Sequence, residues 1–289
     1  MIHTIQNQHL QVSASTAGAE LRSIRSCGGT EYLWQGDPAY WGDRAPNIFP
    51  YVARLTRGQY TYQGKTYSLP IHGFAPTAEF TVTEETASSV TFTLESTPEL
   101  LKQYPFAFRY HIRYTLEEST LHAELRVENR DGKTMYFGLG GHPGINVPLE
   151  EGLSFTDYAL EFPPCQPRRV EFTPECFITG NADPFPLENG KLPLRHDLFD
   201  QDAIVLKGVP GEVTLRSAKG ERGVTLTAPD LKVLGFWHMP KTDAPYVCLE
   251  PWSSLPSRQD VVEDLETPPD LISLPAGEVW TTTWSLRCF

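Results

Sequence analysis

Residues 108–128 read FRYHIRYTLEESTLHAELRVE, and this stretch decides the fold class. Apolar side chains stand at every second position from Phe108 to Leu116, and again from Leu121 to Val127, with polar or charged side chains between them. This two-residue period is typical of half-buried antiparallel strands, because alternate side chains of a strand point to opposite faces of its sheet. The stretch therefore predicts two strands, each with one face in the core and one toward water.

The same alternation recurs on both sides of this stretch, and helical patterns are scarce. Residues 90–94 alternate in the same way, and residues 213–216 and 224–227 are separated by a glycine-containing loop, which predicts a hairpin. A Thr-Pro-Glu start predicts a short helix over residues 97–102, and a second short helix is expected over residues 260–265. We therefore expect an all-β protein, a sandwich of antiparallel strands with few short helices.

The composition is that of a globular chain and argues against a nucleic-acid partner. Of 289 residues, 40% are apolar and 11% aromatic, which is ample material for a buried core. The formal net charge is −12, and no basic block provides the attraction on which nucleic-acid binding depends. The 25 prolines and 22 glycines are spread along the chain rather than gathered in a linker, so we expect residues 1–289 to form a single domain.

Targeting and redox patterns favour a cytoplasmic protein that does not insert into membranes. Residues 1–10, MIHTIQNQHL, lack the basic start and apolar run of a secretory signal, and no apolar run is long enough for a membrane helix. The five cysteines are odd in number and form no C-x-x-C pair. We therefore expect reduced thiols on small buried side chains, and neither a disulfide framework nor a zinc ribbon.

Four short segments carry an ionisable side chain among glycine, proline and aromatic residues. They are NIFPYVAR at residues 47–54, IHGFA at 71–75, GGHPGIN at 140–146 and CLEPW at 248–252. Loss of hydration in such surroundings shifts pKa values toward the range that acid–base catalysis needs. A proline follows both His142 and Glu250, which favours extended backbone and places these two side chains at strand ends or in loops.

Each of these segments also has a structural interpretation when it is taken alone. A histidine in a glycine-rich loop, such as His142 or His72, is often only a hydrogen-bonded loop residue, and Arg54 fits an ion pair with a carboxylate equally well. The motifs of zinc peptidases, serine esterases and P-loop enzymes are absent, and the cluster RHDLFDQDA at residues 195–203 lacks the spacing of a calcium loop. What remains is chemistry by histidine and carboxylate side chains on an all-β scaffold.

Taken together and in this order, the four segments resemble the aldose 1-epimerase (mutarotase) family, and most closely its bacterial LacX-like branch. The resemblance runs from GAELRSI at residues 18–24 to PAGEVW at residues 275–280. It implies a galactose-mutarotase-like β-supersandwich of antiparallel strands. It also implies an enzyme that interconverts the α and β anomers of free aldoses such as glucose or galactose, with no metal and no organic cofactor.

The resemblance also implies which residues act. His142 in GGHP matches the general acid that protonates the ring oxygen, and Glu250 in LEPW matches the base that takes the proton of the C1 hydroxyl. Such a pair can open a pyranose from both sides of the reacting bond. We expect Glu250 to be ionised and His142 protonated near neutral pH, because each charge favours the other.

Four further residues are implied as sugar-binding groups. His72 in HGFA matches a histidine near the reacting centre, and Arg54 matches an arginine that binds sugar hydroxyls. Asp202 in QDAIV resembles the substrate-binding aspartate, and Trp237 is expected to form a wall of the pocket. The partner is therefore a monosaccharide, and the chain is expected to be a monomer or a homodimer.

Other functions remain open at this point. A non-catalytic carbohydrate-binding protein on the same scaffold, or a structural β domain, would need only part of this set. A glycoside hydrolase would need a second acid beside Glu250, for which Asp202 is the candidate. A hexose-6-phosphate mutarotase would need a basic phosphate site, and the candidates for it are Arg44, Arg54, Arg57 and Lys241. Because the chain is strongly acidic, we expect unphosphorylated aldoses as substrates.

Overall fold

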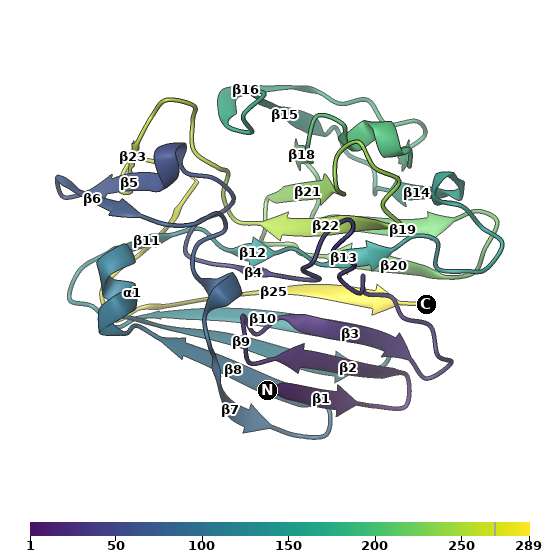
Figure 1. The fold of residues 1–289 in the computed structure, drawn as a ribbon, viewed down its shortest axis with the longest axis horizontal. Coiled ribbons are helices and arrows are strands. Elements are labelled where there is room, and N and C mark those ends of the chain that lie inside the picture. Colours follow the sequence, from purple (N-terminus) through teal and green to yellow (C-terminus); the bar gives the residue numbers. More distant parts are fainter. Residues whose placement is uncertain (269) are drawn as a thin grey trace.

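Strands dominate the chain, as the alternation predicts. The computed structural model describes residues 1–268 and 270–289, and within them it contains 25 strands, one α-helix and four short 3-10 helices (Figure 1). The expected all-β sandwich with few short helices is thereby confirmed. No helix in the described residues is long and apolar enough to cross a membrane.

The alternating stretch forms the middle of a nine-stranded antiparallel sheet. Its two halves are β9 (Phe108–Glu117) and β10 (Thr120–Asn129), which pair over their whole length, and the apolar side of each is buried. The predicted hairpin is also present, as β19 and β20. On the β10 side, the neighbouring strands are, from β10 outward, β25 (Val279–Cys288), β20 (Gly223–Thr227), β19 (Glu212–Ser217), β14 (Tyr158–Glu161) and β17 (Lys191–Pro193). On the β9 side they are β8 (Ser89–Glu95) and then β7 (Thr81–Glu85).

A second sheet, of eight strands, faces the first (Figure 1). Its strands come from distant parts of the sequence, so the loops that connect them are brought close together in space. Its order is β16 (Ile178–Pro184), β15 (Arg168–Phe172), β18 (Ile204–Lys207), β21 (Val233–Trp237), β22 (Tyr246–Trp252), β12 (Gly140–Gly141) and β4 (Asn47–Ile48), with β13 (Gly144–Asn146) paired to β22.

Three small sheets and five short helices complete the described fold. The small sheets are β1 (Ile2–Gln6), β2 (Leu10–Ser15) and β3 (Leu21–Ser26); β11 (Met135–Phe137) and β24 (Ile272–Leu274); and β23 (Glu263–Asp264), β5 (Gln59–Tyr62) and β6 (Lys65–Ser68). The helices are α1 (Pro98–Gln103) and the 3-10 turns η1 (Thr56–Gly58), η2 (Ala75–Thr77), η3 (Phe155–Asp157) and η4 (His196–Phe199).

One of the two predicted helices is present and the other is wrong. Helix α1 begins as expected, with the Thr97 hydroxyl accepting the Leu100 N–H at 3.2 Å. Residues 260–265 form no helix. Instead β23 pairs in parallel with β5, and the carboxylate of Glu263 binds the guanidinium of Arg258 at 2.8 Å. Tertiary pairing thus overrides the local preference of this segment.

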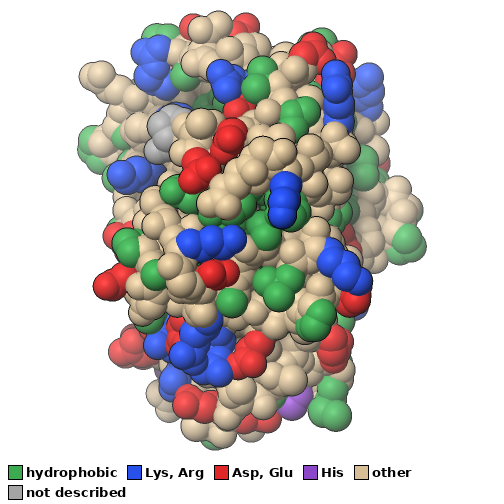
Figure 2. Space-filling model, turned by 90° about the vertical axis from the view of Figure 1, so that its left-hand side faces the viewer, with side chains coloured by type: hydrophobic (Ala, Val, Ile, Leu, Met, Phe, Trp, Pro, Cys, Tyr) green, Lys and Arg blue, Asp and Glu red, His purple; other side chains and the backbone are tan. Residues whose placement is uncertain are grey.

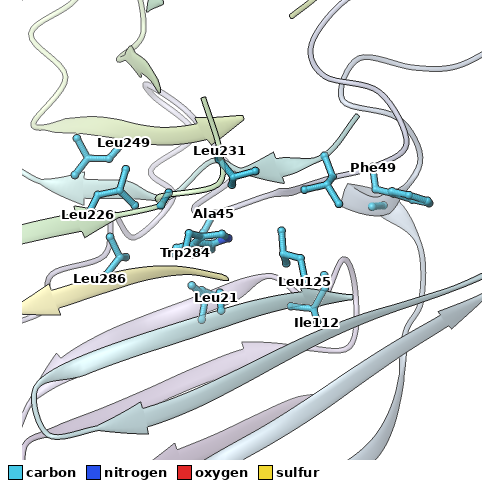
Figure 3. Close-up of a cluster of buried hydrophobic side chains, with 14 of the residues drawn as sticks. Leu21, Ala45, Phe49, Ile112, Leu125, Leu226, Leu231, Leu249, Trp284 and Leu286 are labelled. Carbon is cyan, nitrogen blue, oxygen red and sulfur yellow. The ribbon is translucent and has the colours of Figure 1, made fainter. Parts of the chain in front are cut away.

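The main core fills the space between the two large sheets. Figure 3 shows Leu249 of β22 on one side and Leu286, Leu125 and Ile112 of the nine-stranded sheet on the other, with Trp284 between them. All five side chains are essentially inaccessible to water. Since Leu249 points into this core, its neighbours along β22 point to the opposite face of the eight-stranded sheet.

Charged side chains of both signs are mixed on the surface. Figure 2 shows the face at the left-hand side of Figure 1, where basic side chains lie next to acidic ones and no broad basic surface forms. A group of basic side chains lies at the lower left of this view, and acidic side chains border it.

Candidate active site

Glu250 lies in the middle of β22, on the face turned away from the main core. Its side chain is only 2% exposed. The neighbouring even-numbered residues Cys248 and Trp252 are also buried on this face. Directly across the ladder, Glu250 pairs with Gly235 of β21. The strand thereby presents a carboxyl group to a cavity rather than to bulk water.

His142 reaches the same place from the connection between β12 and β13. The close packing of β12 needs glycine at position 140, because a Cβ there would clash with the carbonyl of Pro251. The backbone N–H of His142 donates to the carbonyl of Pro46 at 3.1 Å. These contacts bring His142 Nε2 to 3.2 Å from Glu250 Oε2, so the two residues of the predicted acid–base pair touch.

His72 comes from the turn after β6. The next residue, Gly73, has φ +75° and lies so close to Phe49 that any side chain would clash with the Phe49 carbonyl. His72 Nδ1 accepts the backbone N–H of Ala53 at 3.3 Å, so the neutral ring carries its proton on Nε2 and can donate it. Burial, with the nearby positive charge of Arg54, lowers the pKa of His72 to about 4. His72 is therefore neutral at physiological pH.

Arg54 lies at the cavity mouth and is exposed. No carboxylate in the described residues lies within 4.0 Å of its guanidinium, so the alternative interpretation of Arg54 as an ion-pair partner is wrong. Its five donors remain available to a ligand.

Asp202 and Trp237 come from neighbouring strands of the eight-stranded sheet. Asp202 stands between η4 and β18, with φ +75°, and Trp237 is the last residue of β21. The Asp202 carboxylate accepts a hydrogen bond from the Cys176 thiol, with Sγ 2.7 Å from Oδ2. All six residues predicted for the site line one cavity of about 270 Å³. They are Arg54, His72, His142, Asp202, Trp237 and Glu250. A cavity this small suits a monosaccharide-sized ligand.

The sequence interpretation missed several cavity residues. Trp41 packs against the His142 ring, and Asp43 lies beside it in the same loop. The sequence did contain one indication of these residues, which is the aromatic pair Tyr40 and Trp41 within a polar, glycine-containing loop. The cysteines were expected to be small buried side chains, but Cys27 is exposed, and Cys176 is half-buried and faces the cavity. Cys176 lies in the turn between β15 and β16 with φ +66°, and a cysteine in the sequence does not indicate such a turn.

The pKa shifts of the predicted acid–base pair run against the charge states expected from the sequence. Burial lowers the pKa of His142 well below its usual value. Burial and the nearby charge of Asp202 raise the pKa of Glu250 well above the usual carboxyl range. Both shifts have one cause, which is that the charged form loses its hydration. Both shifts favour the uncharged forms, His142 without its second proton and Glu250 with its carboxyl proton.

One group of donor atoms in the described residues is close enough to surround a metal ion. It comprises His142, Cys248 and Glu250, whose donor atoms lie within 4.8 Å of one another. Burial, together with the charge of Glu250, raises the pKa of the Cys248 thiol well above its usual value. All three side chains are buried. All five cysteines are free thiols.

Comparisons with known proteins agree with this geometry. A family model described as aldose 1-epimerase matches residues 1–287. The chromosomal LacX protein of Lactococcus lactis subsp. lactis is 35% identical over 277 residues, which is 92% of each chain. A galactose mutarotase related enzyme from Lactobacillus acidophilus superimposes with a TM-score of 0.95 at 35% identity, over 100% of this chain and 97% of its own. A galactose mutarotase-like protein from Lactobacillus casei ATCC 334 gives 0.95 at 32% identity over both chains in full. These likenesses confirm the expected fold.

Proposed function

The chain belongs to the aldose 1-epimerase family, and we propose that it interconverts the α and β anomers of free aldoses by acid–base ring opening and closure. As a member of that family it is an isomerase of the mutarotase type. The observation that carries the proposal is the contact of 3.2 Å between His142 Nε2 and Glu250 Oε2 in the lining of a sugar-sized cavity.

Ring opening needs two proton transfers at adjacent oxygen atoms. Glu250 takes the proton of the C1 hydroxyl, and the electrons of that O–H bond form the aldehyde C=O. The bond from C1 to the ring oxygen breaks, its electron pair stays on that oxygen, and His142 supplies the proton. Both oxygens are bonded to C1, so an acid and a base in contact with each other can reach both. Rotation about C1–C2 followed by the reverse transfers gives the other anomer.

The single proton held by the pair is the right number for this cycle. Transfer of that proton across the contact from Glu250 to His142 produces the ionised pair from which ring opening starts. Hydroxyl groups of a bound sugar favour that transfer, because hydrogen bonds to a carboxylate stabilise its charged form. After ring closure the pair again holds one proton, so the enzyme is regenerated without an external acid or base.

The remaining lining residues support recognition of an uncharged sugar. The guanidinium of Arg54, the Nε2–H of His72 and the carboxylate of Asp202 offer donors and acceptors, and Trp237 offers an apolar face. Arg54 is the one Lys or Arg in the described cavity lining, while Asp43, Asp202 and Glu250 are acidic. The other three basic residues considered for a phosphate site, Arg44, Arg57 and Lys241, do not line it. This balance supports unphosphorylated aldoses over hexose 6-phosphates.

The test is polarimetry of freshly dissolved sugars with the purified protein. We expect faster approach to the usual final rotation with α-D-glucose or α-D-galactose, and little acceleration with glucose 6-phosphate. Acceleration confined to the phosphorylated sugar would replace the proposed substrate class. Sugar binding by calorimetry without any acceleration would show a carbohydrate-binding protein instead of an enzyme.

A further inference from the structure

The His142 imidazole is oriented without a hydrogen bond at its second nitrogen. Nε2 lies 3.2 Å from Glu250 Oε2, but neither this oxygen nor the buried Nδ1 of His142 makes a hydrogen bond to any described residue. A catalytic imidazole is commonly fixed by a carbonyl or carboxylate that accepts from the nitrogen not used in proton transfer. Since the described protein supplies no such partner here, packing has to fix the ring.

Three rings surround the imidazole. His72 and Trp237 meet it edge to face, with ring centroids 5.3 and 5.8 Å away and interplanar angles of 86° and 83°. Trp41 lies closer, at 5.0 Å, and its plane is tilted by only 35° from that of the imidazole. Trp41 therefore covers the broad face of the ring, whereas the other two limit its edges.

Trp41 is itself firmly held, although it lies in the loop between β3 and β4. Its ring stacks on Tyr246 of β22 at 5.7 Å, and its backbone carbonyl accepts the Trp34 indole N–H at 2.9 Å. The adjacent Tyr40 hydroxyl donates to Asp243 at 2.9 Å, which ties the loop to the β21–β22 connection. Because Tyr246 is on the strand that carries Glu250, Trp41 links the positions of the acid and the base.

We propose that Trp41 is a positioning residue: its indole face holds the His142 imidazole in register with Glu250, in the place that a hydrogen bond to Nδ1 usually takes. The inference rests on the proposed mutarotase function for its kinetic consequence. A displacement of about 1 Å between reacting groups costs on the order of 100-fold in rate. Loss of the indole should therefore reduce turnover more than sugar affinity.

The kinetic test compares three substitutions in this loop. We expect Trp41→Ala to lower kcat by roughly 10- to 100-fold with a smaller change in KM, and Trp41→Phe to restore most of kcat. Tyr40→Phe is the matched control: it removes the loop hydrogen bond to Asp243 but leaves the stack of Trp41 on Tyr246 and its hydrogen bond from Trp34, so its kcat should stay within about twofold of wild type. If Trp41→Ala does not fold, Trp41→Leu takes its place, since it fills space without an aromatic face. A KM effect alone, or equal kcat for Trp41→Phe and the non-aromatic variant, would overturn the proposal.

A second readout does not depend on turnover. The Cε1–H NMR signal of His142, assigned by its loss in His142→Asn, should be single and sharp in wild type and Tyr40→Phe. It should broaden or split in the non-aromatic Trp41 variant, because the ring then samples several orientations. An unchanged single signal would refute the positioning role. If wild type accelerates no mutarotation, the proposed function fails, and this signal still decides the role of Trp41.

Discussion

The contact between His142 and Glu250 predicts that the two residues act as one unit. Replacing either His142 by Asn or Glu250 by Gln should remove the proton relay and lower kcat by about 10²–10⁴, which corresponds to about 3–5 kcal/mol of transition-state stabilisation. Two independent contributions would multiply to about 10⁴–10⁸ in the double variant. With Nε2 and Oε2 3.2 Å apart, we instead expect the double variant to be no slower than the slower single variant.

The assay is the initial rate of change in optical rotation of fresh α-D-glucose, corrected for the uncatalysed reaction. Folding is checked by circular dichroism and urea unfolding. Glu250→Gln should be at least as stable as wild type at pH 7, because folding raises the pKa of this carboxyl and thereby costs free energy at neutral pH that an amide does not lose. Multiplicative losses in the double variant, or near-normal turnover in a folded single variant, would refute the mechanism.

Three further predictions follow from the site. The one-proton pair is lost in acid when His142 gains a proton and in alkali when Glu250 loses its own. Because burial lowers the pKa of His142, the acid limb of kcat/KM should lie below the usual histidine value of about 6.5, and because burial raises the pKa of Glu250, any alkaline limb should lie well above the usual carboxyl range; an acid limb centred at or above about 6.5 would contradict this. Arg54→Ala should raise KM by about tenfold and leave kcat within about threefold of wild type, since Arg54 is an exposed binding group. Steady-state kinetics measure both constants, and a large loss of kcat would show instead that Arg54 takes part in the proton transfers. Gly73→Ala should lower the free energy of unfolding by roughly 1–3 kcal/mol, because φ is +75° at this position and the new Cβ meets the Phe49 carbonyl. Urea unfolding measures this change. In the same experiment, a single unfolding transition of the wild-type protein would support one domain over residues 1–289.

The sequence was sufficient for the strands predicted at residues 90–94, 108–116, 121–127, 213–216 and 224–227 and for the six residues that line the cavity. Strict alternation over residues 108–128 leaves one face to bury, so its strands could be predicted, and the four short segments meet because β4, β12 and β22 pair side by side. The failures concern contacts between distant residues. Trp41 reaches the site through stacking on Tyr246, and residues 260–265 form β23 because β5 lies beside them.

The expected charge states of His142 and Glu250 differ from the direction of their pKa shifts for a related reason. Attraction between an acid and a base can be expected from their residue types, but the loss of hydration depends on how completely the fold encloses them. In this structure both side chains are almost entirely removed from water, at 10% exposed for His142 and 2% for Glu250. Desolvation at this depth favours the uncharged form of each group, against the attraction that the sequence indicated.

The most direct test of the account is whether the wild-type protein accelerates anomer interconversion. Fresh α-D-glucose and α-D-galactose are followed by polarimetry with and without the protein, at equal final concentrations. We expect a faster approach to an unchanged final rotation for at least one of the two sugars. No acceleration with either sugar, nor with xylose, arabinose or glucose 6-phosphate, would contradict it and leave the paired His142 and Glu250 without a mutarotase role.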